Sequence, residues 1–215
     1  MRPEFSGEKA QDSAFTEALA ALKQNGSNII VVGANGESAH AAVCERLLGA
    51  DSLRQRLVVR TDPDASCGWV PDDATEGATD VVSYGGAHAE DADTVVDSEL
   101  LGPLGKTVAR SIDEVASDDA GLEPAELRVC FDGLDPLFAD HESETVFRLV
   151  HVLTARIREV QGMGHFHIRV DEDEDHVRLL EPLFDAIVVV RSSSGTAEHR
   201  WRLPDQDIES EWFEL

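Results

Sequence analysis

The chain has 215 residues, of which 42% are hydrophobic and 28% charged; this predicts one globular domain over residues 1–215 and excludes a disordered chain. It carries 43 acidic and 18 basic residues, a net charge of -25 without a basic stripe, which excludes direct binding to DNA or RNA because phosphate contacts need lysine and arginine. Lysine is scarce, so we expect a salt-accumulating, halophilic cytoplasm, where molar salt shortens the Debye length to about 3 Å and screens carboxylate repulsion.

The N-terminal half of the chain alternates helices with short strands. Residues 13–24 place apolar side chains on one helical face, and they define an N-terminal helical segment over residues 1–27. Apolar runs and helical periodicity then predict, in chain order, a strand over 28–32, a helix over 38–48, strands over 56–60 and 80–84, and a helix over 103–116. Residues 61–94 are rich in Asp, Ala, Gly and Thr, which predicts an acidic, loop-rich insertion.

The C-terminal half alternates longer helices with buried strands. Its predicted elements are a strand over 127–131, a helix over 143–161, a strand over 165–170, a helix over 174–183, and strands over 186–190 and 197–203. A turn at 192–195 predicts that the last two strands form a C-terminal β-hairpin. Strands that alternate with helices of this length are typical of βαβ units, so we expect an α/β fold with a mostly parallel sheet and helices on both faces.

A glycine-containing turn follows the first predicted strand. Gly33, Asn35 and Gly36 lie between that strand and a helix, an arrangement whose free N–H groups can hold phosphate. In the working motif a lysine precedes Ser or Thr, whereas here Glu37 precedes Ser38 and two loop residues are missing. One charge pair at about 4 Å and a dielectric near 20 is worth about 4 kcal/mol, so this reversal predicts a disabled nucleotide site. The alternatives are a tight turn with Ser38 as N-cap, or a site for a smaller or less charged ligand.

Candidate site residues also follow two strands of the second half. Asp132 ends an apolar strand as a Walker B aspartate does, and it either holds magnesium through water or caps the following turn. His165 and His167 alternate in a strand and face the same side; they line the carboxyl-edge crevice with Asp171 or pack under a helix. Adding His151 or Asp171 as a further ligand gives no spacing typical of a metal site, so neither a metal nor a catalytic residue is expected.

The cysteines and the absence of long apolar runs exclude further classes of protein. Cys44 and Cys130 lie in apolar segments and are expected to pack as small hydrophobic residues, whereas Cys67 in a Gly- and Asp-rich stretch is expected to be exposed. Their spacing is not typical of structural zinc, and no cofactor is expected. No run approaches the about 18 apolar residues of a membrane span, so we expect a cytoplasmic protein without membrane contact.

The end of the chain is rich in aromatic residues. Trp201 lies in the last predicted strand, and Trp212 and Phe213 lie in a tail over residues 204–215. These side chains either dock back onto the sheet or form an exposed apolar patch suited to a protein partner or to self-association.

Three segments of the second half resemble a known group of proteins. The phrases LRVCFDGLDPLF, ETVFRLVHVLTARIREVQGMGHFHI and LLEPLFDAIVVVR resemble the second half of KaiC- and GvpD-type domains of the RecA superfamily. The phrases RVCFD, GMGHFH and RWxL are similar to haloarchaeal HTR-like (transducer-like) proteins, and the likeness covers residues 28–215. The resemblance implies a three-layer RecA-like, P-loop NTPase-like fold and a link to signal transduction. It carries over one functional position, Asp132.

The leading hypothesis is therefore a degenerate, non-catalytic RecA/KaiC-like module that acts in regulation or signal transduction. It is expected to work through contacts with a protein partner or with itself, without ATP hydrolysis. The alternative is an ATP-binding or ATP-hydrolysing KaiC-like enzyme with an aberrant Walker A loop. ATP and magnesium are cofactors only under that alternative.

Overall fold

The computed structural model describes residues 5–49, 53–63, 77–117, 121–193 and 195–215. Its strands are β1 (Ser27–Val32), β2 (Gln55–Arg60), β3 (Thr79–Tyr84), β4 (Thr94–Val96), β5 (Leu127–Phe131), β6 (Met163–Ile168), β7 (Ala186–Ser193), β8 (Thr196–Leu203), β9 (Ile208–Glu209) and β10 (Phe213–Glu214). Its α-helices are α1 (Phe5–Asn25), α2 (Glu37–Leu48), α3 (Leu101–Ala116), α4 (Asp135–Asp140), α5 (Ser143–Glu159) and α6 (Asp175–Leu180). Short 3-10 turns span Ala89–Asp91, Glu181–Leu183 and Pro204–Gln206.

The strands form one sheet in the order β10-β8-β7-β1-β6-β5-β2-β3-β4, with β9 beside β8. All pairings from β7 to β4 in this order are parallel. The strands β8, β9 and β10 pair antiparallel, and β7 with β8 forms the expected hairpin. The predicted α/β class with a mostly parallel sheet is confirmed.

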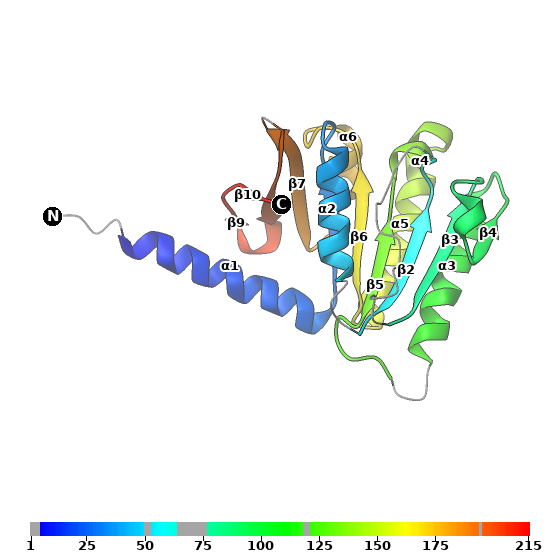
Figure 1. Ribbon diagram of the computed structural model, residues 1–215, viewed down its shortest axis with the longest axis horizontal. Helices are drawn as coiled ribbons and strands as arrows, with labels where there is room; N and C mark the ends of the chain where they lie inside the picture. Colours follow the sequence, from blue (N-terminus) through cyan, green and yellow to red (C-terminus); the bar gives the residue numbers. More distant parts are fainter. Residues whose placement is uncertain (1–4, 50–52, 64–76, 118–120, 194) are drawn as a thin grey trace.

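Successive residues of the central strands face opposite sides of the sheet. Ile30 and Val32 of β1 belong to a core shared with α3 and α5, whereas Ile29 and Val31 pack in a second core with Val43 of α2. Figure 1 shows the same division, with α2 on one face of the sheet and α3 and α5 on the other. Because β1 and β5 are covered on both faces, all their residues are buried; Ile29–Val32 and Val129–Phe131 are apolar, and the polar residues Ser27, Asn28 and Arg128 are buried with them.

Several boundaries differ from the sequence expectations. Asp135–Asp140, for which the sequence predicted no helix, forms α4, because Pro136 in its first turn is compatible with a helix start. The helix expected over 143–161 ends at Glu159. The strand expected over 165–170 is β6, which begins at Met163 although Gly162 and Gly164 lie on either side of that residue. The edge strand β4 was not expected, since a strand of this length carries too little periodicity to be recognised. Residues 64–76 of the expected acidic insertion lie outside the described residues.

The end of the chain returns to the antiparallel side of the sheet. In Figure 1 the C-terminus lies beside β8, where β10 pairs with it through Phe213↔His199 and Glu214↔Glu198. The helix α1 begins at Phe5, earlier than the expected periodic segment. Among the helices of the described residues, none has the length and apolar character needed to cross a bilayer.

Candidate functional site

The glycine turn after β1 is held tightly against the sheet. The Gly33 N–H donates to the Ile168 carbonyl at 3.3 Å, and the Gly33 carbonyl accepts a hydrogen bond from His40 Nε2 at 2.9 Å. A Cβ at Gly33 would come within 2.3 Å of the Val190 carbonyl oxygen, so only glycine permits this close approach to β7. Packing against β7 therefore explains Gly33 without any ligand.

The helix that follows the turn begins at Glu37. Gly36 is its N-cap residue, without a side-chain cap, so the expected capping role of Ser38 is wrong. Ser38 is the second helical residue, and a residue inside the first turn cannot occupy the N-cap position. Asn35, Glu37 and Ser38 are exposed. The Glu37 carboxylate lies in the first turn, where an anion interacts favourably with the helix dipole and where a bound phosphate would need to place its own charge.

A pocket of about 620 Å³ opens beside this turn, at the carboxyl ends of β1 and β7. Its lining includes Asn35, the acidic run Asp171–Asp173, and Arg191 with Trp212. The carboxyl edge of a parallel sheet is where ligands bind in folds of this class. The structure therefore places Asp171 in the expected crevice, together with two further acidic side chains that the sequence interpretation did not single out.

Asp132 lies at the carboxyl end of β5 and is 1% exposed. Its Oδ1 accepts hydrogen bonds from the Thr61 N–H at 2.8 Å and the Thr61 hydroxyl at 3.1 Å, so it binds the end of β2 rather than capping its own turn. Its Oδ2 has no hydrogen-bond partner among the described residues. Burial raises the pKa of Asp132 from 3.8 to about 6, although the hydrogen bonds from Thr61 act in the opposite direction.

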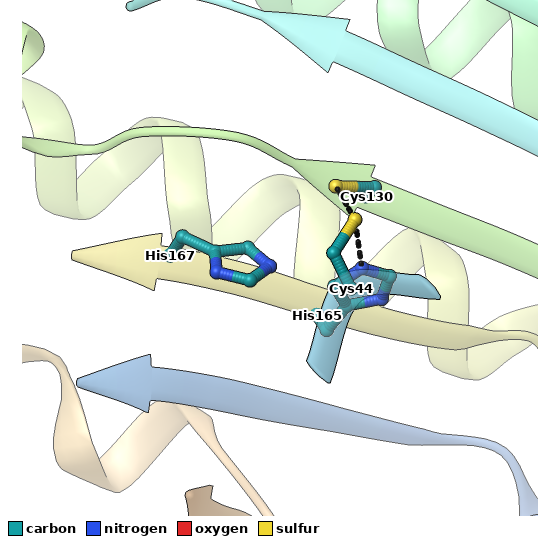
Figure 2. A group of neighbouring side chains, drawn as sticks. All are labelled: Cys44, Cys130, His165 and His167. Carbon is teal, nitrogen blue, oxygen red and sulfur yellow. Dashed lines mark hydrogen bonds between the residues drawn. The ribbon is translucent and has the colours of Figure 1, made fainter. Parts of the chain in front are cut away.

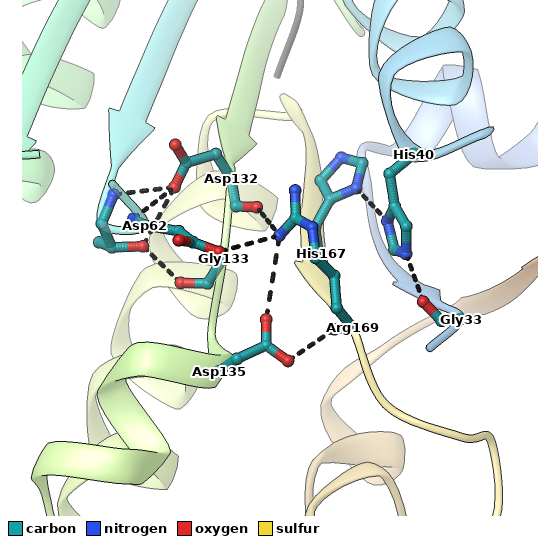
Figure 3. Close-up of polar contacts among 9 residues, drawn as sticks. Gly33, His40, Asp62, Asp132, Gly133, Asp135, His167 and Arg169 are labelled. Atoms are coloured by element: carbon teal, nitrogen blue, oxygen red, sulfur yellow. Dashed lines mark hydrogen bonds and ion pairs between the residues drawn. The ribbon is translucent and has the colours of Figure 1, made fainter. Parts of the chain in front are cut away.

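Arg169 supplies a positive charge to this part of the sheet edge, as Figure 3 shows. Its Nη1 donates to the Asp132 carbonyl oxygen at 2.7 Å and lies 3.6 Å from Asp62 Oδ2 and 3.9 Å from Asp135 Oδ2. The Arg169 backbone N–H also donates to Asp135 Oδ1 at 2.6 Å. A cation of the chain itself thus lies between the carboxyl groups of Asp62 and Asp135 and beside the backbone carbonyl of Asp132, the residue proposed to hold magnesium. Sequence reasoning missed Arg169, because only the fold brings it to these aspartates.

His165 and His167 lie on the α2 side of the sheet, 2% and 1% exposed, and do not line the pocket. Of the two alternatives from the sequence, packing under a helix is the one observed. His167 Nδ1 lies 2.9 Å from Nδ1 of His40 on α2. Burial lowers the pKa of His165 to about 3 and that of His40 to about 4. His151 and Asp171 are exposed and do not join this group.

Cys44 and Cys130 are buried, as their apolar surroundings predict, and Cys44 is disulfide-bonded, though not to Cys130. Their sulfur atoms lie 3.3 Å apart, and the Cys44 sulfur lies 3.5 Å from His165 Nε2. Sequence reasoning treated the cysteines and histidines separately, because the contact depends on the β5–β6 register and on the path of α2. The expectation for Cys67 concerns a position outside the described residues.

The aromatic residues at the end of the chain dock onto the edge of the sheet. The Arg191 guanidinium carbon lies 3.7 Å from the centre of the Trp212 ring, within the range of a cation–π interaction. Trp201 and Phe213 contact the Phe15 ring of α1, with ring centres 6.5 and 6.4 Å apart. Phe213 nevertheless remains 43% exposed. The docking alternative therefore describes this segment, with one aromatic ring partly open to solvent.

A protein-family model matches residues 26–190, from the end of α1 to β7. The chain belongs to the family of unknown function DUF7504. No curated protein matches the chain. The DUF7504 region contains the glycine turn, Asp132, Arg169 and the buried histidines, whereas β8 and the aromatic tail lie beyond it.

Proposed function

We propose that this DUF7504 protein is a non-catalytic, RecA/KaiC-like regulatory or signal-transduction module. In this proposal it acts through protein–protein contacts in a high-salt cytoplasm, does not hydrolyse ATP, and is related to the haloarchaeal HTR-like group. The proposal combines the resemblance of the sequence with the charges found at the carboxyl edge of the sheet.

The arrangement of the sheet supports a three-layer, RecA-like fold. The strand β1 leads through a glycine turn into α2, and β5 ends at Asp132 on the same edge of the sheet. One strand, β6, lies between these two. Helices cover both faces. A nucleotide-binding ancestor would have placed its phosphate loop and its magnesium-binding aspartate at this edge.

The charges on the loop side disfavour a triphosphate. Glu37 is exposed at the start of α2, and Asp171, Glu172 and Asp173 are exposed at the rim of the adjacent pocket. Each like-charge contact with a phosphate at about 4 Å costs up to about 4 kcal/mol at an effective dielectric of 20, and less where molar salt screens it. This accumulation of anions beside the turn is the observation that carries the proposal.

The aspartate side of the edge also disfavours magnesium. Arg169 already contributes a positive charge next to Asp132, Asp62 and Asp135. With a pKa of about 6, Asp132 is partly protonated in weakly acidic solution, and a protonated carboxyl group is a poor ligand for a hard cation. Both halves of a nucleotide site, the phosphate loop and the metal position, are therefore unsuited to Mg-ATP.

The partner surface that we propose is the aromatic end of the chain. Phe213 is 43% exposed, next to Trp212 and Trp201, which are half-buried. Aromatic side chains of this kind are enriched at the centres of protein interfaces. Phe213→Ser is expected to weaken capture of a partner, or self-association, in a high-salt lysate, whereas Glu211→Ser, a change at a neighbouring exposed residue, leaves it intact.

The test of the proposal is ATP turnover by purified protein in molar KCl with magnesium. We expect no turnover above that of the buffer for the wild type and for Asp132→Asn alike. Turnover by the wild type that disappears in Asp132→Asn would replace the regulatory proposal with an enzymatic one. Turnover that is equal in both proteins would indicate a contaminating ATPase, and a further purification step then removes it.

A further inference from the structure

Four buried side chains meet between α2 and the sheet, as Figure 2 shows. Cys130 of β5 and His165 of β6 are register partners, and His167 follows two residues later on the same face of β6. A residue of α2 completes the group from the opposite side. We refer to this group as the Cys2His2 cluster, and its members are Cys44, Cys130, His165 and His167.

The ligand atoms of the Cys2His2 cluster are spaced nearly as a tetrahedral zinc site requires. The two sulfurs are 3.3 Å apart, and Cys44 Sγ lies 3.5 Å from His165 Nε2. All four ligand atoms lie within 4.8 Å of one another. Zn–S bonds of about 2.3 Å and Zn–N bonds of about 2.0 Å give tetrahedron edges of about 3.3 to 3.8 Å. The two sulfurs therefore need to separate by about 0.5 Å, and any wider pair needs to close by at most about 1.5 Å.

A chain of hydrogen bonds fixes which atom His167 presents to the cluster. The Gly33 carbonyl can only accept, so His40 Nε2, 2.9 Å away, carries the proton. His40 Nδ1 then accepts from Nδ1–H of His167 at 2.9 Å, a contact drawn in Figure 3. This leaves His167 Nε2 with its lone pair. That atom is buried and has no hydrogen-bond partner among the described residues.

We propose that the Cys2His2 cluster, once the disulfide bond of Cys44 is reduced, is a closed structural site for one zinc ion. Two sulfurs and two imidazole nitrogens suit zinc, whereas magnesium and calcium need oxygen ligands. The Gly33–His40–His167 chain has the form of the outer shell that orients a metal-bound imidazole. Without a metal, His167 Nε2 is buried without a hydrogen-bond partner among the described residues, which is unfavourable, and a bond to zinc would satisfy it.

The proposed ion would join elements that are distant in the chain. It connects α2 to the neighbouring strands β5 and β6, and through His40 it supports the Gly33 carbonyl at the start of the glycine turn. Zinc would therefore act as a clamp between the helix and the sheet. This role does not depend on the absence of ATP hydrolysis, so the two proposals can fail separately.

The Cys44 sulfur is disulfide-bonded in this structure, and a disulfide sulfur cannot bind zinc as a thiolate. The test therefore uses the full chain after reduction with a thiol reductant, kept reduced in molar KCl. Protein grown or refolded with zinc is desalted and its metal content measured, and its zinc-edge X-ray absorption is recorded. We expect one zinc ion per chain with two sulfur and two nitrogen neighbours. Protein refolded with Co²⁺ is expected to show the visible bands of a tetrahedral site. A protein that retains no metal, or an ion with another ligand set, would overturn the proposal.

Variants test the individual residues. Cys130→Ser and His167→Ala are expected to lose retained zinc, and the exposed His151→Ala of α5 serves as the matched control that keeps it. His40→Ala keeps all four ligands but removes the hydrogen bonds of His40 to His167 and to the Gly33 carbonyl, so we expect zinc affinity to fall about 10- to 100-fold while the two-sulfur, two-nitrogen ligand set persists. Retention of zinc by Cys130→Ser, with unchanged X-ray absorption, would exclude this set of ligands. Because a ligand variant can fail to fold, the wild-type absorption spectrum remains the decisive measurement.

Discussion

Replacing Asp132 by asparagine is expected to make the stability of the protein less dependent on pH. Burial raises the pKa of this carboxyl group in the folded protein from 3.8 to about 6. At pH values between 3.8 and about 6 the folded state binds more protons than the unfolded state. The ionisation of Asp132 therefore lowers the free energy of unfolding as the pH rises through this range. The difference of about 2 pKa units corresponds to about 3 kcal/mol at pH 7, and to about 1.5 kcal/mol at pH 5.

The asparagine keeps the hydrogen-bond acceptor at Oδ1, which the Thr61 N–H needs, and places an amide where Oδ2 has no partner among the described residues. The absolute change in stability mixes several effects, whereas its pH dependence reports the ionisation alone. Between pH 5 and pH 7 we expect the wild type to lose about 1.5 kcal/mol more than Asp132→Asn.

The assay is urea unfolding of both proteins in molar KCl at the two pH values, which lie above the isoelectric point of about 4.4. Asp173→Asn, at an exposed carboxylate, controls for the general effect of removing one negative charge, and its stability profile should run parallel to that of the wild type. Parallel stability profiles for the wild type and Asp132→Asn would refute the view that ionisation of this buried carboxyl group destabilises the folded protein.

Three further predictions concern packing and charge. Gly33→Ala should lower the free energy of unfolding, measured with urea, by about 1–3 kcal/mol, because the new Cβ meets the Val190 carbonyl. Gly36→Ala should lower it by less than about 1 kcal/mol, and equal effects of the two substitutions would contradict the packing account. Arg169→Met leaves carboxyl groups at the sheet edge without their cation and should lower the free energy of unfolding by about 3 kcal/mol. Arg178→Met, at an exposed arginine, should change it little. Unfolding free energy should rise as KCl increases from about 0.1 to 1 M, where the Debye length falls from about 10 to 3 Å; a flat profile would argue against a net charge adapted to salt.

The regular elements of this fold could be predicted from the sequence because their patterns are local. The helices α3 and α5 carry apolar stripes, and β1, β5 and β7 contain the apolar runs Ile29–Val32, Val129–Phe131 and Ala186–Val190. Local patterns are insufficient where a tertiary contact decides the conformation. Gly164 belongs to β6, where a Cβ would come within 2.8 Å of the Asn28 and Ile157 side chains, so a glycine that resembles a turn signal is explained by close packing.

The candidate site likewise contains residues that could be recognised in the sequence and residues that only the fold brings together. The glycine turn, Glu37 and Asp132 are visible in the sequence, because each directly follows a strand or begins a helix. The roles of Arg169 and His40 were not predictable, since their partners lie on other elements and are brought close only by the order of the strands. The same order places two cysteines and two histidines together, although their spacing along the chain gives no sign of it.

The absence of Mg-ATP binding at the glycine turn is the central claim, and isothermal titration calorimetry in molar KCl tests it most directly. Titration of Mg-ATP into the wild-type protein is predicted to give no saturable heat, since Glu37 and the acidic rim oppose the phosphates. Saturable binding that requires magnesium and is lost in Asp132→Asn would contradict the account.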